Sequence, residues 1–100
     1  MDESLAELRK QIDAIDEKLL DILAARMSVV ERIGKYKKVR GIPPLDEERW
    51  REVLASKLSR ARSLNISEVL VENLYNLIHA HALEIEAMEN NRASHKHEDE

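Results

Sequence analysis

The fold is decided by one long stretch of the sequence, residues 5–38, which reads LAELRKQIDAIDEKLLDILAARMSVVERIGKYKK. Apolar residues recur in it at intervals of mostly three, four and seven, which is the spacing of one face of an α-helix. The first potential helix breaker is Gly34, and helical spacing resumes after it. We therefore predict a single helix of about 35 residues, roughly 50 Å long at 1.5 Å per residue.

Local signals mark the two ends of this helix. Residues 4–7 read Ser-Leu-Ala-Glu, a capping box in which Ser4 and Glu7 satisfy free N–H groups of the first turn. Residues 41–44 read Gly-Ile-Pro-Pro and end the helix, because proline cannot continue it. We expect the helix to begin near Ser4 and to end just after Lys38.

Two shorter helices are predicted in the rest of the chain. Asp46 is a good N-cap for a second helix, which fades near residues 63–65. Either Asn65 or Ser67 caps a third helix, whose apolar stripe extends to Ile85. The sequence therefore predicts an all-α fold of three helices with no strands.

The domain organisation follows from where the apolar pattern stops. Residues 1–88 are expected to form one helical domain, since 100 residues make one domain at most. Residues 89–100 are mostly polar, and we expect a frayed, disordered tail there.

Composition excludes several classes of function. The chain has no cysteine, and none of its four histidines is spaced to share a metal ion, so we expect no metal site. The net charge of −4 argues against a nucleic-acid binder. No apolar run is long enough for a membrane span, and residues 1–8 lack the features of a signal peptide. We expect a cytoplasmic protein.

The length of the first helix indicates self-association. A helix of roughly 50 Å is much longer than a 100-residue globule, whose radius of gyration is near 13 Å. The two shorter helices cannot cover its whole apolar stripe, whereas a second copy related by two-fold symmetry can. We favour a homodimer; the alternative is a lone three-helix hairpin with a projecting arm.

Cationic residues of the long helix suggest an anion site. Arg26 and Lys37 are eleven positions apart, share one face, and have Cα atoms roughly 16 Å apart. Arg9 lies about 25 Å before Arg26 and is rotated by about 100°, so it could join them only from a second chain. Each of these residues could instead be an ordinary solvated charge.

Three further residues are candidates for a site. Glu86 lies at the edge of the third apolar stripe, where it is either a partly desolvated carboxylate or an ordinary rim residue. Trp50 is expected to pack in the core, and His81 is expected to be buried near the centre of the third stripe.

These motifs, taken together, resemble the all-helical chorismate mutases over about residues 5–88. The likeness is carried by LRKQIDAIDEKLL at 8–20, LAAR at 23–26, IGKYK at 33–37, IP at 42–43, DEER at 46–49 and LYNLIH at 74–79. The resemblance implies an intertwined homodimer with two active sites, each built from both chains. It also implies conversion of chorismate to prephenate, in phenylalanine and tyrosine biosynthesis, with no cofactor, metal or covalent intermediate.

The resemblance also assigns roles to individual residues. It implies that Arg9 reaches a substrate carboxylate from the partner chain and that Arg26 binds a carboxylate. Lys37 and Glu86 would lie at the ether oxygen whose bond breaks. The side of the site near the ring hydroxyl would be shaped by Asp46 and Arg49.

The sequence departs from the family pattern at three positions. Trp50 stands where a glutamate often touches the ring hydroxyl, and Ala82 replaces a small polar residue that can help to bind a carboxylate. Glu86 replaces a neutral amide and can donate a hydrogen bond only when protonated, so we expect activity to fall as pH rises.

Other readings remain open at this point. Relatives with a similar frame are isochorismate-pyruvate lyases or 4-amino-4-deoxychorismate mutases. A non-catalytic helical dimerisation module would explain the apolar stripe but not the matching cationic residues. The polar tail leaves room for docking to another shikimate-pathway enzyme.

Overall fold

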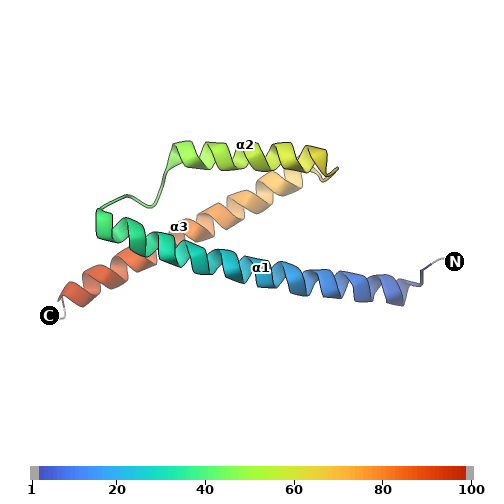
Figure 1. Ribbon diagram of the computed structural model, residues 1–100, viewed down its shortest axis with the longest axis horizontal. Coiled ribbons are helices and arrows are strands. Elements are labelled where there is room, and N and C mark those ends of the chain that lie inside the picture. Colours follow the sequence, from blue (N-terminus) through green and yellow to red (C-terminus); the bar gives the residue numbers. More distant parts are fainter. Residues whose placement is uncertain (1–2, 99–100) are drawn as a thin grey trace.

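The computed structural model describes residues 3–98, with side chains described through residue 89. Within that range the structure contains three helices and no strands, so the predicted all-α fold of three helices is confirmed. The helices are α1 (Leu5–Arg40), α2 (Glu47–Ser63) and α3 (Glu68–Glu98). The molecule is elongated, with extents of 68 × 29 × 16 Å, because α1 extends well past the other two helices toward the N-terminus (Figure 1).

Both predicted ends of α1 are confirmed. Ser4 Oγ accepts the backbone N–H of Glu7, and the Glu7 carboxylate accepts the N–H of Ser4, each at 3.1 Å. Gly41 closes the helix in the left-handed conformation, with φ 68°, a region that glycine enters without steric cost. The Gly-Ile-Pro-Pro segment at residues 41–44 therefore ends the helix, as predicted.

The caps of the other two helices depend on side-chain acceptors. Asp46 Oδ1 accepts the N–H of Arg49 at 3.0 Å, as expected for the N-cap of α2. Ser67 Oγ accepts the N–H of Leu70 at 3.2 Å, so Ser67 rather than Asn65 caps α3. Asn65 instead makes the turn, with a φ of 57° that asparagine tolerates better than most residues.

The C-terminal part of α3 differs from the sequence prediction. The backbone is helical through residues 89–98, where we expected a frayed tail; residues 99 and 100 lie outside the described range. A helix that is already nucleated extends one hydrogen bond per residue, so a polar segment can continue it. Glu89 is 8 % exposed, so packing also extends at least that far.

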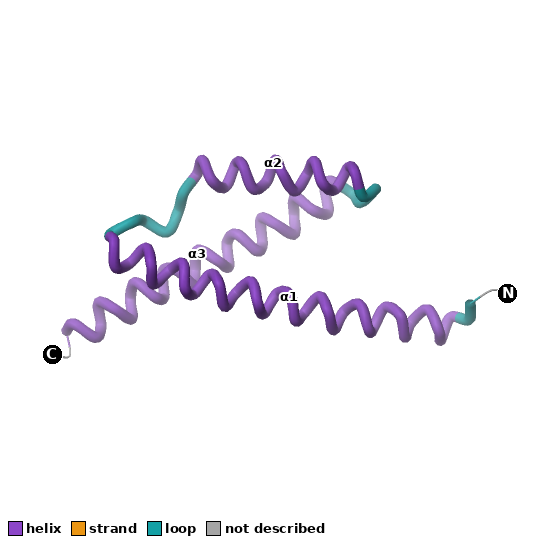
Figure 2. Tube along the Cα trace, viewed as in Figure 1, coloured by secondary structure: helices purple, strands orange, loops and turns teal. Residues whose placement is uncertain are grey.

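The helix α3 forms the base of the fold. It packs against both α1 and α2, while α1 and α2 make no close backbone approach to each other in the described chain (Figure 2). Gly34 marks the tightest crossing: a Cβ there would lie 3.2 Å from Glu86 Cα and 3.3 Å from Glu89 Cβ. The absence of a side chain at Gly34 therefore lets the C-terminal half of α1 lie against α3.

The apolar core of a single chain is small. Among the described residues, the buried apolar side chains are those of Val30, Ala61, Ile78 and Ala82. Large apolar residues of the N-terminal half of α1 are exposed instead, including Ile12 and Ile15 at 57 % each. No helix in the described range is long and apolar enough to cross a membrane.

Candidate active site

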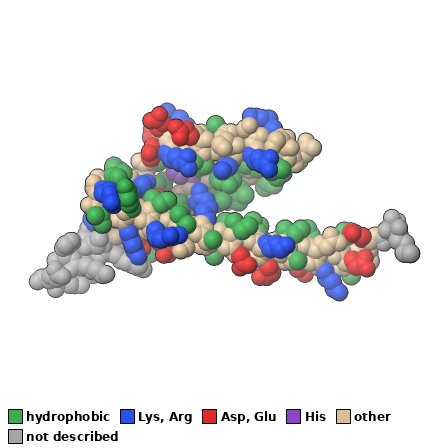
Figure 3. All heavy atoms as spheres, in the orientation of Figure 1, with side chains coloured by type: hydrophobic (Ala, Val, Ile, Leu, Met, Phe, Trp, Pro, Cys, Tyr) green, Lys and Arg blue, Asp and Glu red, His purple; other side chains and the backbone are tan. Residues whose placement is uncertain are grey.

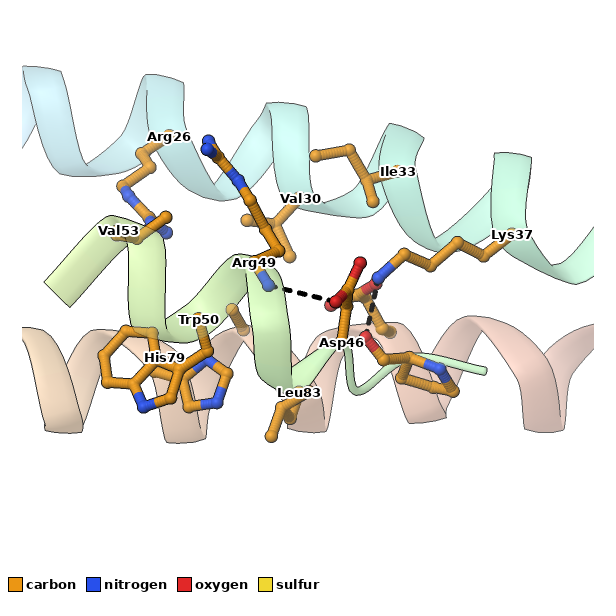
Figure 4. A pocket seen from close by; sticks show the side chains of 13 residues that line it. Arg26, Val30, Ile33, Lys37, Asp46, Arg49, Trp50, Val53, His79 and Leu83 are labelled. Carbon is orange, nitrogen blue, oxygen red and sulfur yellow. Dashed lines mark hydrogen bonds and ion pairs between the residues drawn. The ribbon is translucent and has the colours of Figure 1, made fainter. Parts of the chain in front are cut away.

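The three helices and the loop before α2 line an open pocket (Figure 4). Each helix contributes side chains spaced by three or four residues, that is, one face of each helix. The lining comes from α1 (Arg26, Val30, Ile33, Lys37), the loop (Pro44, Asp46), α2 (Arg49, Trp50, Val53) and α3 (His79, Ala82, Leu83, Glu86).

Lys37 and Glu86 define one end of the pocket. Lys37 Nζ lies 2.9 Å from Glu86 Oε1 and donates a hydrogen bond of 2.6 Å to the carbonyl oxygen of Pro44. Glu86 is buried, with 6 % of its surface exposed. Its contact with Lys37 is an ion pair whose geometry does not meet the criteria for a hydrogen bond. The ammonium group is thus fixed in place by α3 and by the loop before α2.

Arg26 lies at the other end of the pocket, about three helical turns before Lys37 on α1. Its side chain is partly buried, and its Nη1 atom has no hydrogen-bond partner in the described structure. A buried donor without an acceptor is unfavourable by about 1–3 kcal/mol, and more for a charged group. An anionic ligand group at this end would supply the missing acceptor.

The first turn of α2 brings Asp46 and Arg49 to the mouth of the pocket. Asp46 is held as the N-cap through its bond to the N–H of Arg49. In Figure 4 the Arg49 side chain extends from α2 toward α1. Arg26, Lys37 and Arg49 therefore face one small space, which is suited to a ligand with more than one negative charge.

An aromatic pair closes the Arg26 end. The rings of Trp50 and His79 are stacked, with centroids 3.9 Å apart and planes 8° from parallel. Burial lowers the pKa of His79, helped by the positive charges of Arg26 and Lys37 and opposed by the negative charge of Glu86. The imidazole is therefore held in its neutral form at neutral pH.

Two predictions about aromatic residues are corrected here. His81 was expected in the buried stripe, but its side chain is 58 % exposed and faces Glu84, 3.5 Å away. His79 takes the inward position, because residues two apart on a helix point about 200° from each other. Trp50 is half-buried and lines the pocket, so it is more than a core residue.

The structure brings six of the seven predicted site residues into one pocket. These are Arg26, Lys37, Asp46, Arg49, Ala82 and Glu86. Arg9 is exposed on the N-terminal half of α1 and does not line the pocket of its own chain. His79 was missed by the sequence reasoning, although its spacing of three, four and seven residues from Ala82, Leu83 and Glu86 could have revealed it.

The chemistry of the pocket is that of charged and polar side chains. In the part of the chain that the structure describes, no cluster of three or more histidine, aspartate or glutamate residues could hold a metal ion. Three cations, the carboxylates of Asp46 and Glu86 and a neutral imidazole surround the space. The arrangement can grip a small polyanion and place a fixed ammonium against one of its oxygens.

A pocket of this kind between three helices is suited to a small anionic molecule. Comparison with known proteins shows which family the chain belongs to. Residues 8–87 match the family chorismate mutase type II. The chorismate mutase of Methanocaldococcus jannaschii is 31 % identical over 98 residues, which cover 96 % of this chain and 99 % of that protein. The chain therefore belongs to the chorismate mutase type II family.

Two other relatives show the range of the family. The T-protein of Enterobacter agglomerans is 39 % identical over 70 residues, 70 % of this chain, and the match covers only 19 % of the length of that protein. A 4-amino-4-deoxychorismate mutase of Streptomyces pristinaespiralis is 32 % identical over 74 residues, covering 74 % of this chain and 57 % of that protein.

Proposed function

We propose that this protein is a cytoplasmic chorismate mutase that rearranges chorismate to prephenate, a step toward phenylalanine and tyrosine. The observation that carries the proposal is Lys37, held by Glu86 and by the carbonyl of Pro44 at one end of a pocket whose other end presents an unpartnered Arg26. The reaction is an intramolecular rearrangement, so it needs no nucleophile or base.

The catalytic task is orientation followed by charge stabilisation. The flexible enolpyruvyl group must be held over the ring, and Arg26 and Arg49 would do this by binding carboxylates. As the ether C–O bond breaks, negative charge builds on its oxygen. The fixed ammonium of Lys37 would stabilise that charge more than it stabilises the ground state.

Glu86 forms an ion pair with Lys37 in the free protein, so it could donate a hydrogen bond to the ether oxygen only after taking up a proton in the occupied site. A carboxylic acid can donate a hydrogen bond to the ether oxygen, whereas a carboxylate repels the charge that forms there. We expect activity to fall as pH rises, and Glu86→Gln to make the pH profile flatter because an amide donates at any pH. An unchanged profile in Glu86→Gln would contradict this role.

A second copy of the chain would complete the site. The surface of α1 also carries an apolar groove next to this pocket, lined by Ile22, Ala25, Arg26, Val29, Val30 and Ile33. The pocket of one chain has a volume of about 180 Å³, below the roughly 300–1,000 Å³ of typical small-molecule sites. An intertwined homodimer would cover the groove, enclose the pocket and deliver the partner's Arg9 to the substrate.

Mixing two inactive variants tests the shared site directly. One variant is Arg9→Ala and the other is Lys37→Met. In a mixed dimer, one of the two sites would contain both wild-type residues, and random mixing would restore about a quarter of the wild-type activity. No recovery after unfolding and refolding the mixture would show that Arg9 and Lys37 do not act across chains.

The direct test of the activity is loss of chorismate absorbance with purified protein at about pH 5 and pH 8, with the product identified by chromatography. Prephenate formed faster at pH 5 supports both the mutase and the role of Glu86. No turnover of chorismate, with turnover of 4-amino-4-deoxychorismate, would favour the second candidate, which the Streptomyces relative supports.

A binding measurement separates an enzyme from a simple dimerisation module. A bicyclic dicarboxylate that mimics the transition state should raise the melting temperature, because a ligand that binds only the folded state stabilises it by mass action. A non-catalytic module would show no such shift.

A further inference from the structure

His79 is a neutral polar group of the pocket that the catalytic proposal does not use. It lies on the same face of α3 as Glu86, two turns earlier, and its ring is stacked on Trp50 with centroids 3.9 Å apart. The described residues offer it no hydrogen-bond partner. A partly buried imidazole with no partner, in a pocket, is a candidate for contact with a ligand.

The other polar groups around His79 are engaged in other interactions or carry a positive charge. Lys37 and Glu86 are paired, and Asp46 caps α2. The remaining side chains with strong donors, Arg26 and Arg49, are cations suited to carboxylates. His79 and the indole N–H of Trp50 are thus the neutral hydrogen-bonding groups of this lining, and of the two only an imidazole can both donate and accept.

We propose that His79, held in place by Trp50, binds the hydroxyl group on the ring of the substrate and selects a hydroxyl-bearing ring over an amine-bearing one. The inference rests on the proposed function, since it concerns the substrate of that same site. A hydroxyl group is both donor and acceptor and matches a neutral imidazole. Stacking on Trp50 fixes the plane of the imidazole and with it the direction of its nitrogen atoms.

The charges around His79 support a neutral substituent. Burial and the cations Arg26 and Lys37 outweigh Glu86, so this part of the pocket disfavours a positive charge on the imidazole itself. An ammonium group brought to the same place by a ligand would meet the same desolvation and the same two cations. The site therefore discriminates against a protonated amine as well as recognising a hydroxyl.

The hydrogen bond can be measured with a double-mutant cycle between protein and ligand. The ligands are the bicyclic dicarboxylate with its ring hydroxyl and the same compound with hydrogen in that place. His79→Phe keeps a flat ring on Trp50 but removes both nitrogen atoms. We expect His79→Phe to weaken binding of the hydroxyl compound about five- to tenfold and to leave the deoxy compound nearly unchanged.

Matched variants keep this result specific. His81→Phe makes the same change on the exposed face of α3 and should alter neither affinity. His79→Gln retains a donor and an acceptor and should recover part of the lost affinity. Because Trp50 is the only tryptophan, its fluorescence reports whether the stack survives in each variant.

Substrate choice provides the second measurement. Wild-type protein should have a kcat/KM for chorismate at least tenfold above that for 4-amino-4-deoxychorismate, and His79→Phe should narrow this ratio. The inference would be overturned if His79→Phe lost equal affinity for both bicyclic compounds, or if the wild type preferred the amine substrate. Neither result would contradict the proposed function. Failure of the wild type to bind either compound would contradict the proposed function and the inference together.

Discussion

The two halves of α1 carry the same apolar periodicity in opposite surroundings. In the C-terminal half, Val30 and Gly34 are buried against α3, and the helix supplies Arg26 and Lys37 to the pocket. In the N-terminal half, from Leu5 to Ile22, the apolar side chains are exposed. Figure 3 shows them along the edge of the projecting helix, with acidic side chains on the opposite edge.

The comparison shows how one helix can serve two purposes. The C-terminal half is specialised by Gly34, which permits close packing, and by charges that α2 and α3 surround. The N-terminal half has an apolar face with nothing on it in a single chain, together with Arg9. Under the proposed function, the C-terminal half of α1 builds the chain's own site, and the N-terminal half completes the site of the partner chain.

The largest effect should come from breaking the C-terminal half at Lys37. Lys37→Met removes the ammonium group that faces the breaking bond, and loss of one such donor lowers kcat by about 100- to 1,000-fold. Steady-state kinetics with chorismate measures it. Lys35→Met, an exposed change two residues earlier, should retain wild-type activity; equal losses in both variants would mean that Lys37 acts only through general charge.

The next effect should come from the N-terminal half. Ile15→Glu places a charge on the exposed apolar stripe, and two-fold symmetry applies the change twice. At about 1.5 kcal/mol per copy, the dimer dissociation constant should rise roughly 100-fold. Sedimentation or light scattering measures it, and Glu17→Lys on the opposite face is the control. A monomeric wild type would favour the hairpin with a projecting arm.

The helices could be predicted because their signals are local. The capping box at Ser4, the stop at Gly41 and the cap at Asp46 each depend on residues within one turn. The polar composition of residues 89–98 does not show whether a helix continues from a packed turn, and the backbone there is helical. The packing of Gly34 on α3 could not be predicted either, since it depends on contacts between distant residues.

Residue type and family resemblance together predicted which side chains would share the pocket, as for Lys37 and Glu86. His79 escaped because its role depends on which face of α3 turns toward Trp50, and periodicity alone placed His81 inward. A shift of two residues along the sequence turns a side chain from the buried face of a helix to its exposed face. Three-dimensional packing, rather than a motif, decides which of the two histidines lines the pocket.

A smaller effect should follow from filling the helix crossing. Gly34→Ala removes a flexible residue from a helix interior, a gain of about 1 kcal/mol when there is space. Here the new Cβ would lie 3.2 Å from the backbone of Glu86, so the helices must separate. We expect a net loss of about 1 kcal/mol in the free energy of unfolding, and a larger loss for Gly34→Leu.

Denaturant titration measures this change, and kinetics adds a second reading. Separation of α1 from α3 would also move Lys37 away from Glu86, so kcat should fall along with stability. A Gly34→Ala protein that is more stable than the wild type would show that α3 yields at this crossing and that glycine is not required there.

The smallest effect should be a pH dependence of stability that belongs to His79. Burial lowers the pKa of His79 below the usual value of 6.5 for histidine. Between the folded-state and unfolded-state pKa values, the unfolded chain therefore binds a proton that the folded chain does not. The free energy of unfolding must therefore decline as pH falls from about 6.5 to the folded-state pKa, and level off below it. His79→Phe should lose this component, whereas His81→Phe, on the exposed face, should keep it. Denaturant unfolding of the three proteins from pH 7 to pH 5 measures this component, because the contributions of all other ionisable groups cancel when the free energies of unfolding are subtracted. If the free energy of unfolding changes equally with pH in the wild type and in His79→Phe, the imidazole is not held neutral beside Arg26 and Lys37.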